Sequence, residues 1–124
     1  MSFFLVFIGS GLGGAARYGL GVLSIRLFGL GFPFGTLIIN IFGSVLMGVT
    51  VALFAKSSVS GPELRLFLTT GLIGGFTTFS TFSLDAGALW YRGERLASAS
   101  YVALSVVASL AALVASMIIV RRWL

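Results

Sequence analysis

The chain contains long stretches without a single charged residue, and these stretches limit what it can fold into. Residues 27–55 form a run of 29 residues free of Lys, Arg, Asp and Glu, and residues 66–84 form a second run of 19. A helix needs about 20 predominantly apolar residues to cross the hydrocarbon core of a bilayer. Only 9% of the 124 residues are charged, against about 25% in an ordinary soluble domain. The sequence therefore predicts an integral membrane protein.

The composition excludes several classes of chemistry. The chain has no Cys and no His, which removes thiolate nucleophiles, disulfides, Cys/His metal centres and His-based catalytic triads. The three acids, Glu63, Asp85 and Glu94, give a hydrolase that needs paired carboxylates almost nothing to work with. The eight basic residues are scattered singly or in pairs, so they form no face long enough to follow a phosphate backbone. We expect neither an enzyme nor a partner of nucleic acid.

The charged residues divide the chain into four apolar segments of membrane-spanning length. We expect one all-α transmembrane domain over residues 1–124, with spans at residues 3–28, 32–55, 64–90 and 96–120. Lys56–Glu63 is the polar linker of greatest length. In the third span, Gly74-Gly75 is followed by hydroxyl residues, which predicts a helix broken at mid-membrane. Interrupted membrane helices free backbone carbonyls, and such carbonyls commonly bind Na⁺.

The distribution of positive charge gives no clear orientation in the membrane. With four spans, both termini and the polar linker share one side. The positive-inside rule needs an imbalance between the two sides to fix orientation. A near tie favours insertion both ways and hence an antiparallel, dual-topology homodimer, while a weak bias that still yields one orientation is the alternative. Lys56, Arg65, Arg121 and Arg122 stand on the side of the termini, Arg26, Arg92 and Arg95 on the other, and Arg17 is ambiguous.

Polar and aromatic side chains inside the spans mark where a function could reside, since four spans cannot enclose a wide aqueous pore. Asn40 lies in the middle of the second span, one turn after Thr36. Its amide is either an interhelical hydrogen-bonding group or a donor along a conduction path. Phe79 and Phe82 are three residues apart and share a helix face. They either stack in the core or turn their positive ring edges toward an anion.

The fourth span carries a stripe of hydroxyl groups within one narrow sector of the helix. The stripe is either glue between helices or a track of hydrogen-bond donors, and it contains no carboxylate that would suit proton coupling. Arg17, inside the first span, either extends to the interface or faces a water-filled cavity, where it would concentrate anions. Taken together, these groups describe a path for an anion. The stripe consists of Ser98, Tyr101, Ser105, Ser109 and Ser116.

Three segments of the chain carry a resemblance to a known family. They are Gly13-Gly14-Ala15-Ala16-Arg17-Tyr18, Gly35-Thr36 with Asn40 and Gly43, and above all Gly74-Gly75-Phe76-Thr77-Thr78-Phe79-Ser80-Thr81-Phe82-Ser83. With these segments the chain resembles the Fluc-type fluoride channels, also called the CrcB family, over nearly its whole length. The last segment is very specific, because few other proteins have such a string at mid-membrane.

The resemblance implies a dual-topology homodimer in the bacterial inner membrane that lets fluoride leave the cell passively and so relieves its toxicity. It implies two pores, each built from both subunits, and a structural Na⁺ at the dimer interface held by the backbone carbonyls of Gly74 and Thr77. It gives Asp85 no role. By this resemblance the fluoride pathway is lined by Asn40, Phe79, Phe82, Thr36, Tyr101, Ser105, Ser109 and Arg17.

Two other functions stay open at this point. A small proton-coupled multidrug exporter is also a four-helix antiparallel dimer, but it needs a membrane-embedded Glu in its first helix, where this chain has no acid. A small scaffold of a membrane complex would explain the 17 glycines, but not the amide, the hydroxyl stripe and the paired rings together. The expected partners are fluoride, membrane lipid and a second copy of the chain.

Overall fold

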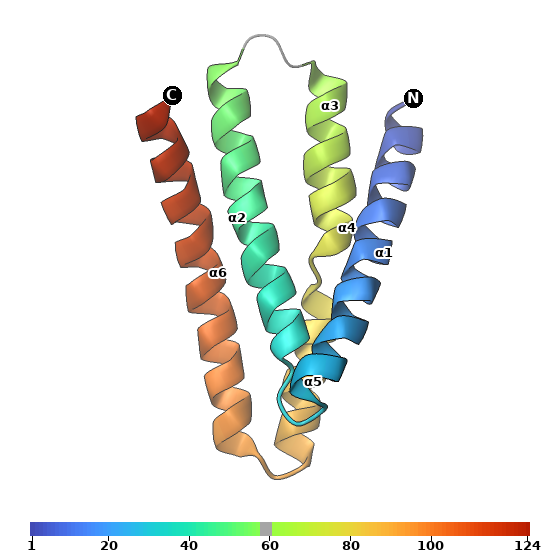
Figure 1. Cartoon of the computed structure of the whole chain (residues 1–124), viewed down its shortest axis with the longest axis vertical. Helices are drawn as coiled ribbons and strands as arrows, with labels where there is room; N and C mark the ends of the chain where they lie inside the picture. The colour runs from blue at the N-terminus through green and yellow to red at the C-terminus, as the bar shows by residue number, and fades with distance from the viewer. Residues whose placement is uncertain (58–60) are drawn as a thin grey trace.

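The computed structural model describes residues 1–57 and 61–124, and within these residues the chain is all-helical (Figure 1). It forms four antiparallel rods, of which the third in sequence is interrupted. The elements are α1 (Ser2–Phe28), α2 (Phe34–Lys56), α3 (Pro62–Leu66), the π-helical segment η1 (Phe67–Ile73), α4 (Gly74–Phe76), α5 (Phe79–Tyr91) and α6 (Arg95–Trp123).

Three of the rods, α1, α2 and α6, are long and apolar enough to cross a membrane as single helices. The predicted spans 3–28, 32–55 and 96–120 fall on them, with ends that differ by a few residues. The predicted span 64–90 falls on the third rod, from α3 to α5. The number of membrane rods and the all-α class therefore agree with the sequence prediction.

Both termini and the ends of α2 and α3 lie at one end of the molecule, and the two short turns lie at the other (Figure 1). This arrangement places Lys56 and Arg65 at the same end as the C-terminal arginines, as the four-span topology requires. Residues 58–60, in the middle of the predicted polar linker, lie outside the described residues.

The third rod breaks at Thr77 and Thr78, just beyond the Gly-Gly pair. Both residues have extended backbone, with ψ of 159° and 123°. Thr78 then caps α5, because its hydroxyl accepts a hydrogen bond from the backbone N–H of Thr81 at 3.2 Å. The π-helical turns of η1 precede the short helix α4 that ends at the break, and such wide turns are rare and often mark functional sites. The predicted interruption at mid-membrane is confirmed.

Small residues bring α1 close to the third rod. A Cβ on Gly13 would overlap the carbonyl oxygen of Leu72, and one on Gly9 would lie 2.9 Å from the Cα of Gly71. Helices in lipid associate by this kind of close backbone approach. The absence of side chains at Gly9, Gly13 and Gly71 therefore allows the backbones of α1 and the third rod to come into contact.

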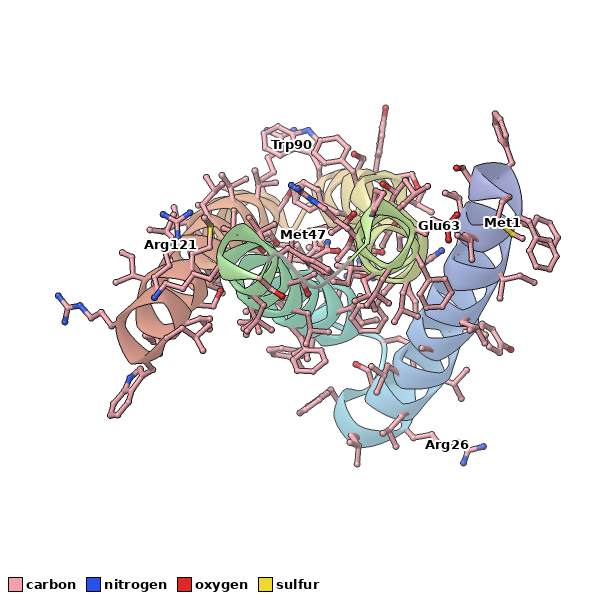
Figure 2. All side chains as sticks on the ribbon, turned by 90° about the horizontal axis from the view of Figure 1, so that it is seen from above. Met1, Arg26, Met47, Glu63, Trp90 and Arg121 are labelled. Carbon is pink, nitrogen blue, oxygen red and sulfur yellow. The ribbon has the colours of Figure 1, made fainter. Side chains whose placement is uncertain are left out.

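The opposite side of the molecule is formed by α6 lying along α2. Large apolar side chains extend outward from the rods, and Figure 2 shows them along the whole length of α1 and α6. Within the spanning windows of these two helices, only 11% and 6% of the residues are buried inside the chain. Most of the apolar surface of one chain therefore faces lipid or another protein.

Candidate functional site

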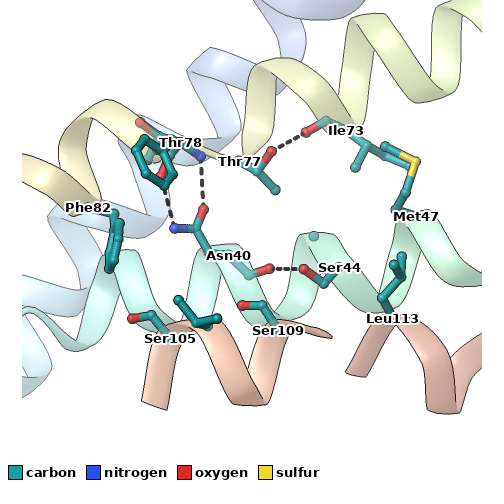
Figure 3. A pocket seen from close by; sticks show the side chains of 13 residues that line it. Asn40, Ser44, Met47, Ile73, Thr77, Thr78, Phe82, Ser105, Ser109 and Leu113 are labelled. Atoms are coloured by element: carbon teal, nitrogen blue, oxygen red, sulfur yellow. Dashed lines mark hydrogen bonds between the residues drawn. The ribbon is translucent and has the colours of Figure 1, made fainter. Parts of the chain in front are cut away.

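The carboxamide of Asn40 bridges α2 to the break in the third rod (Figure 3). Its Nδ2 donates to the carbonyl oxygen of Thr78 at 2.9 Å, and its Oδ1 accepts from the Thr78 N–H, also at 2.9 Å. An extended residue inside a membrane leaves peptide groups without helical partners, and each such group costs several kcal/mol in lipid. The amide replaces the missing helical turn, so the interhelical hydrogen bond expected of Asn40 is present. Its Nδ2 carries a second hydrogen, which the two bonds to Thr78 do not use.

A cavity of about 330 Å³ lies between α2, α6 and the break (Figure 3). No charged side chain is among the described residues that line it. Polar groups and rings instead come together from three separate elements. Of the predicted pathway residues, this first cavity is lined by Asn40, Phe79, Phe82, Ser105 and Ser109.

Two hydroxyls of the predicted stripe already donate hydrogen bonds to backbone carbonyl oxygens of the chain. Ser98 donates to the carbonyl oxygen of Ala86 on α5 at 2.8 Å. Ser116 donates to the carbonyl oxygen of Leu113, in its own helix, at 2.9 Å. Neither hydroxyl is left to act as a donor for an ion.

Of the three stripe hydroxyls between them, that of Tyr101 donates to Asp85 at 3.2 Å, and the other two behave differently. The Oγ atoms of Ser105 and Ser109 are buried and have no hydrogen-bond partner among the described residues. Both residues line the first cavity. A buried hydroxyl without a partner costs about 1–3 kcal/mol, so the pair favours a polar ligand in this cavity. The structure therefore divides the stripe into hydroxyls that have a hydrogen-bond partner and two that have none among the described residues, and a role of these two as donors along an ion path stays a prediction.

The rings of Phe79 and Phe82 lie beside each other on α5, with centroids 5.4 Å apart and planes at 59°. The predicted shared face is confirmed. Phe82 is buried in the chain, at 8% exposure, whereas Phe79 is 78% exposed. The ring of Phe82 is thus packed within this chain, whereas the ring of Phe79 extends from its surface toward lipid or another protein.

A second cavity, of about 390 Å³, lies on the other side of the break, between α1, α2 and α5. Arg17 and Thr36 from the predicted pathway line it, together with Asp85. Thr78 lines both cavities. The hydrogen-bonded pair of Asn40 and Thr78 therefore stands at the boundary between them.

Arg17 faces this second cavity from the middle of α1. Its Nε donates to the carbonyl oxygen of Gly75 at 3.3 Å. Gly75 lies in the last turn before the break, where carbonyl groups carry the partial negative charge of a helix end. The guanidinium thus both satisfies the end of the half-helix and supplies positive charge to the cavity. Two environments were predicted for Arg17, the membrane interface and a cavity, and the structure places its side chain in the wall of a cavity.

The backbone at the break also fits a cation held by carbonyl oxygens. The Ile73 carbonyl accepts from the N–H and the hydroxyl of Thr77, at 3.0 and 3.2 Å. The N–H of Thr78, which would donate to the Gly74 carbonyl in an unbroken helix, donates to Asn40 Oδ1 instead, and Thr77 itself lies in the extended segment. Free carbonyl oxygens at an interrupted membrane helix are the type of ligand that Na⁺ takes. The predicted pair of ligands is therefore compatible with the structure.

Comparison with known proteins identifies the family. Residues 4–117 match the family described as CrcB-like protein, Camphor Resistance (CrcB). The chain belongs to the CrcB family. A protein of Cereibacter sphaeroides named fluoride-specific ion channel FluC is 52% identical over 119 residues, which cover 96% of this chain and 94% of that protein. Proteins with the same name in Methylobacterium nodulans and Agrobacterium fabrum are each 50% identical, over 119 and 118 residues.

Membership of the CrcB family confirms the resemblance found in the sequence. The matched relatives are named as ion channels, so the prediction that this CrcB chain is not an enzyme is confirmed. The matched residues 4–117 include the linings of both cavities and the break. The roles of the individual pathway residues and of Na⁺ stay predictions.

Two residues of the site escaped the sequence analysis, and one predicted residue lies apart from both cavities. Thr78 was noted only as part of a motif, and Asp85 was assigned no role, although a charged residue inside a span is a signal of function. Tyr101 lines neither cavity in the single chain and is fully buried behind Phe82.

Proposed function

We propose that this CrcB chain forms a fluoride-selective channel through which cytoplasmic fluoride leaves passively, which relieves fluoride toxicity. The observation that carries the proposal is the pair of buried hydroxyls, Ser105 and Ser109, which have no partner in residues 1–57 and 61–124 and line a cavity together with Phe79 and Phe82. The relatives named as fluoride-specific channels support it.

Fluoride is small and strongly hydrated, so a selective path must replace its water with short, strong donors. Hydroxyl groups and the free hydrogen of the Asn40 amide are donors of this kind. A phenyl ring has a positive edge, which attracts an anion without the hydration that an ammonium group would need. The first cavity therefore combines weak positive potential with no fixed charge to trap the ion.

The second cavity supplies the approach to this path. Arg17 places a guanidinium in its wall, and a cation in a recessed site raises the local concentration of anions. An ion that enters there meets the boundary formed by Asn40 and Thr78 before it reaches the hydroxyl pair. We assign Thr36, which lines the same cavity, to this approach.

The chain acts as an antiparallel, dual-topology homodimer in the bacterial inner membrane. Its third rod exposes Phe79 and the hydroxyl residues Thr70, Ser80 and Ser83 at membrane depth. Ser80 and Ser83 have hydrogen-bond partners within the rod, but a face that combines an exposed ring with polar side chains is better covered by a second copy than by lipid. The near tie of positive charge between the two ends supports insertion in both orientations.

A structural Na⁺ at the interface of the two copies completes the proposal. The carbonyl oxygens of Gly74 and Thr77 would hold it. Its positive charge would stabilise the carbonyl-rich end of the first half-helix, where the dipole is negative.

The proposal is tested by fluoride efflux from liposomes that contain the purified protein, followed with a fluoride electrode, with chloride efflux measured in parallel. Rapid loss of fluoride with retention of chloride is the expected result. A folded protein that releases no fluoride contradicts the proposal, and proton-driven uptake of lipophilic cations by the same vesicles would then favour the multidrug exporter.

A further inference from the structure

Asp85 lies on α5, inside the predicted span 64–90, and a carboxylate within a membrane span is costly unless it has a partner and a function. Within the described residues, the ion pair found is Arg92–Glu94, at 3.4 Å, and Asp85 has none. Its Oδ2 instead accepts a hydrogen bond from the hydroxyl of Tyr101 on α6, at 3.2 Å. A carboxylate within a membrane span whose observed partner is the neutral hydroxyl of Tyr101 needs an explanation.

The ring of Tyr101 is held on both sides. It is 0% exposed. Phe32 meets it edge-on, with centroids 5.6 Å apart and planes at 90°, and Phe82 packs against it at 5.4 Å and 45°. A phenol has one hydrogen to donate, and here that hydrogen is directed to Asp85. The hydroxyl therefore cannot donate to an ion while this bond exists.

The bond connects Asp85 to the ring that lines the first cavity. Asp85 follows Phe82 by three residues, so both lie on one face of α5. The side chain of Tyr101, on α6, contacts both residues, because its hydroxyl donates to Asp85 and its ring packs against the ring of Phe82. A second α5–α6 hydrogen bond, from Ser98 to Ala86, lies next to it. These contacts hold the two helices together at the level of the ring.

We infer that Asp85 is a positioning residue that, by holding the hydroxyl of Tyr101, fixes the ring of Phe82 at the wall of the first cavity. The inference rests on the proposed function, since ring orientation matters only if the ring edge meets an anion. The edge of a phenyl ring attracts an anion and its face repels one. Fluoride is therefore expected to pass more slowly when the Phe82 ring turns freely than when the ring is held with its edge toward the cavity.

The alternative is that Asp85 acts through its charge, because it shares the second cavity with Arg17. Two variants separate these possibilities. Asp85→Asn removes the charge and keeps an oxygen that accepts from Tyr101, while Asp85→Leu removes both at similar volume. We expect Asp85→Asn to retain most of the fluoride efflux rate. We expect Asp85→Leu to lose about tenfold, which corresponds to the loss of one hydrogen bond.

Tyr101→Phe completes a double-mutant cycle. It is expected to reproduce the loss seen in Asp85→Leu, and the two substitutions combined are expected to cost no more than either one. Equal losses in Asp85→Asn and Asp85→Leu, or losses that add to that of Tyr101→Phe, overturn the inference. If Asp85→Leu does not fold, the efflux rates of Asp85→Asn and Tyr101→Phe still test the inference, which expects a loss in Tyr101→Phe and little loss in Asp85→Asn. Glu94→Gln, which removes an acid at the exposed end of the rods, is the control and is expected to leave the rate unchanged.

A second readout is independent of ion passage. With 4-fluorophenylalanine in place of Phe82, the fluorine-19 NMR linewidth reports how freely the ring moves. Asp85→Leu and Tyr101→Phe are expected to change this signal, and Asp85→Asn is not. An unchanged signal in all three overturns the inference, even if fluoride moves. If wild-type vesicles release no fluoride, the proposed function fails, and the NMR comparison still tests the positioning of the ring.

Discussion

The hydroxyl groups of α6 have different roles because their surroundings differ, although their helical positions are equivalent. Ser98 has a carbonyl oxygen of α5 within reach, and Ser116 has one in its own helix. Ser105 and Ser109 lie opposite the break, where the third rod offers them no acceptor among the described residues. At the scale of single residues, the presence of a nearby acceptor therefore decides which hydroxyls remain free for an ion.

Removal of the free hydroxyls is expected to slow fluoride movement. Ser105→Ala and Ser109→Ala each take away one donor from a desolvated path, and we expect about a tenfold loss of efflux rate for each. Efflux from liposomes measures it. Ser116→Ala is the matched control, since its hydroxyl is already paired. A loss in the control as large as in the other two variants would contradict this division of the stripe.

The paired rings lead to a second expectation at the same scale. Phe79→Ile and Phe82→Ile each slow fluoride flux sharply, because an aliphatic group has no positive edge. The volume is roughly kept, so each variant remains a folded dimer on gel filtration. Normal flux in both folded variants would remove the rings from the path.

At the scale of elements, the central feature is a rod that is stopped in mid-membrane and completed by a neighbour. The Gly-Gly pair lets the backbone approach α1, and the extended residues Thr77 and Thr78 end the half-helix. Asn40 on α2 then supplies both hydrogen bonds that the interruption removes from Thr78. The break is thus a joint property of two helices.

Asn40→Ser tests this joint. The shorter side chain cannot reach both groups of Thr78, and we expect unfolding stability to fall by about 1–2 kcal/mol, with conduction weakened or abolished. Thermal unfolding and efflux are measured on the same sample. Thr50→Ala, further along α2 and outside both cavities, removes a hydroxyl that donates to the carbonyl oxygen of Leu46 in its own helix and serves as the control. Loss of the dimer on gel filtration would assign the amide a structural role, whereas loss of flux in an intact dimer would assign it to the path.

The contact between α1 and the third rod can be tested by a single methyl group. Gly13→Ala places a Cβ on the carbonyl oxygen of Leu72 and the backbone of Phe76, so overpacking is expected to cost about 1–3 kcal/mol. Gly14→Ala, the next residue, meets no atom within 4 Å and is expected to fold as stably as the parent chain. Thermal unfolding of both variants in detergent measures the difference. Equal stability would show that the backbones of the two rods are not in contact there.

At the scale of the whole molecule, the single chain leaves polar groups at membrane depth and much of its apolar surface uncovered. Phe79, which we assign to the path, is itself on that outer surface. We therefore propose that a second copy packs against the third rod and completes the path. The charge balance allows the second copy to be inverted.

Addition of two or three lysines to one end of the chain tests the inverted arrangement. Forced to insert in one orientation, the chain is expected to lose fluoride transport when expressed alone. Transport is expected to return when it is expressed with a version carrying the lysines at the opposite end. Unchanged transport with every chain in one orientation would contradict dual insertion.

The sequence by itself determined the number of rods, their approximate bounds, the interruption after Gly74-Gly75 and the family. These properties follow from local signals: the length of uncharged runs, the position of glycines and a specific motif. Only the tertiary structure decided which polar groups remain free. Hydrogen-bond partners such as Asn40 and Thr78, or Asp85 and Tyr101, are 38 and 16 residues apart in the chain. Whether a donor is satisfied depends on what the fold places beside it, and no local pattern contains that information.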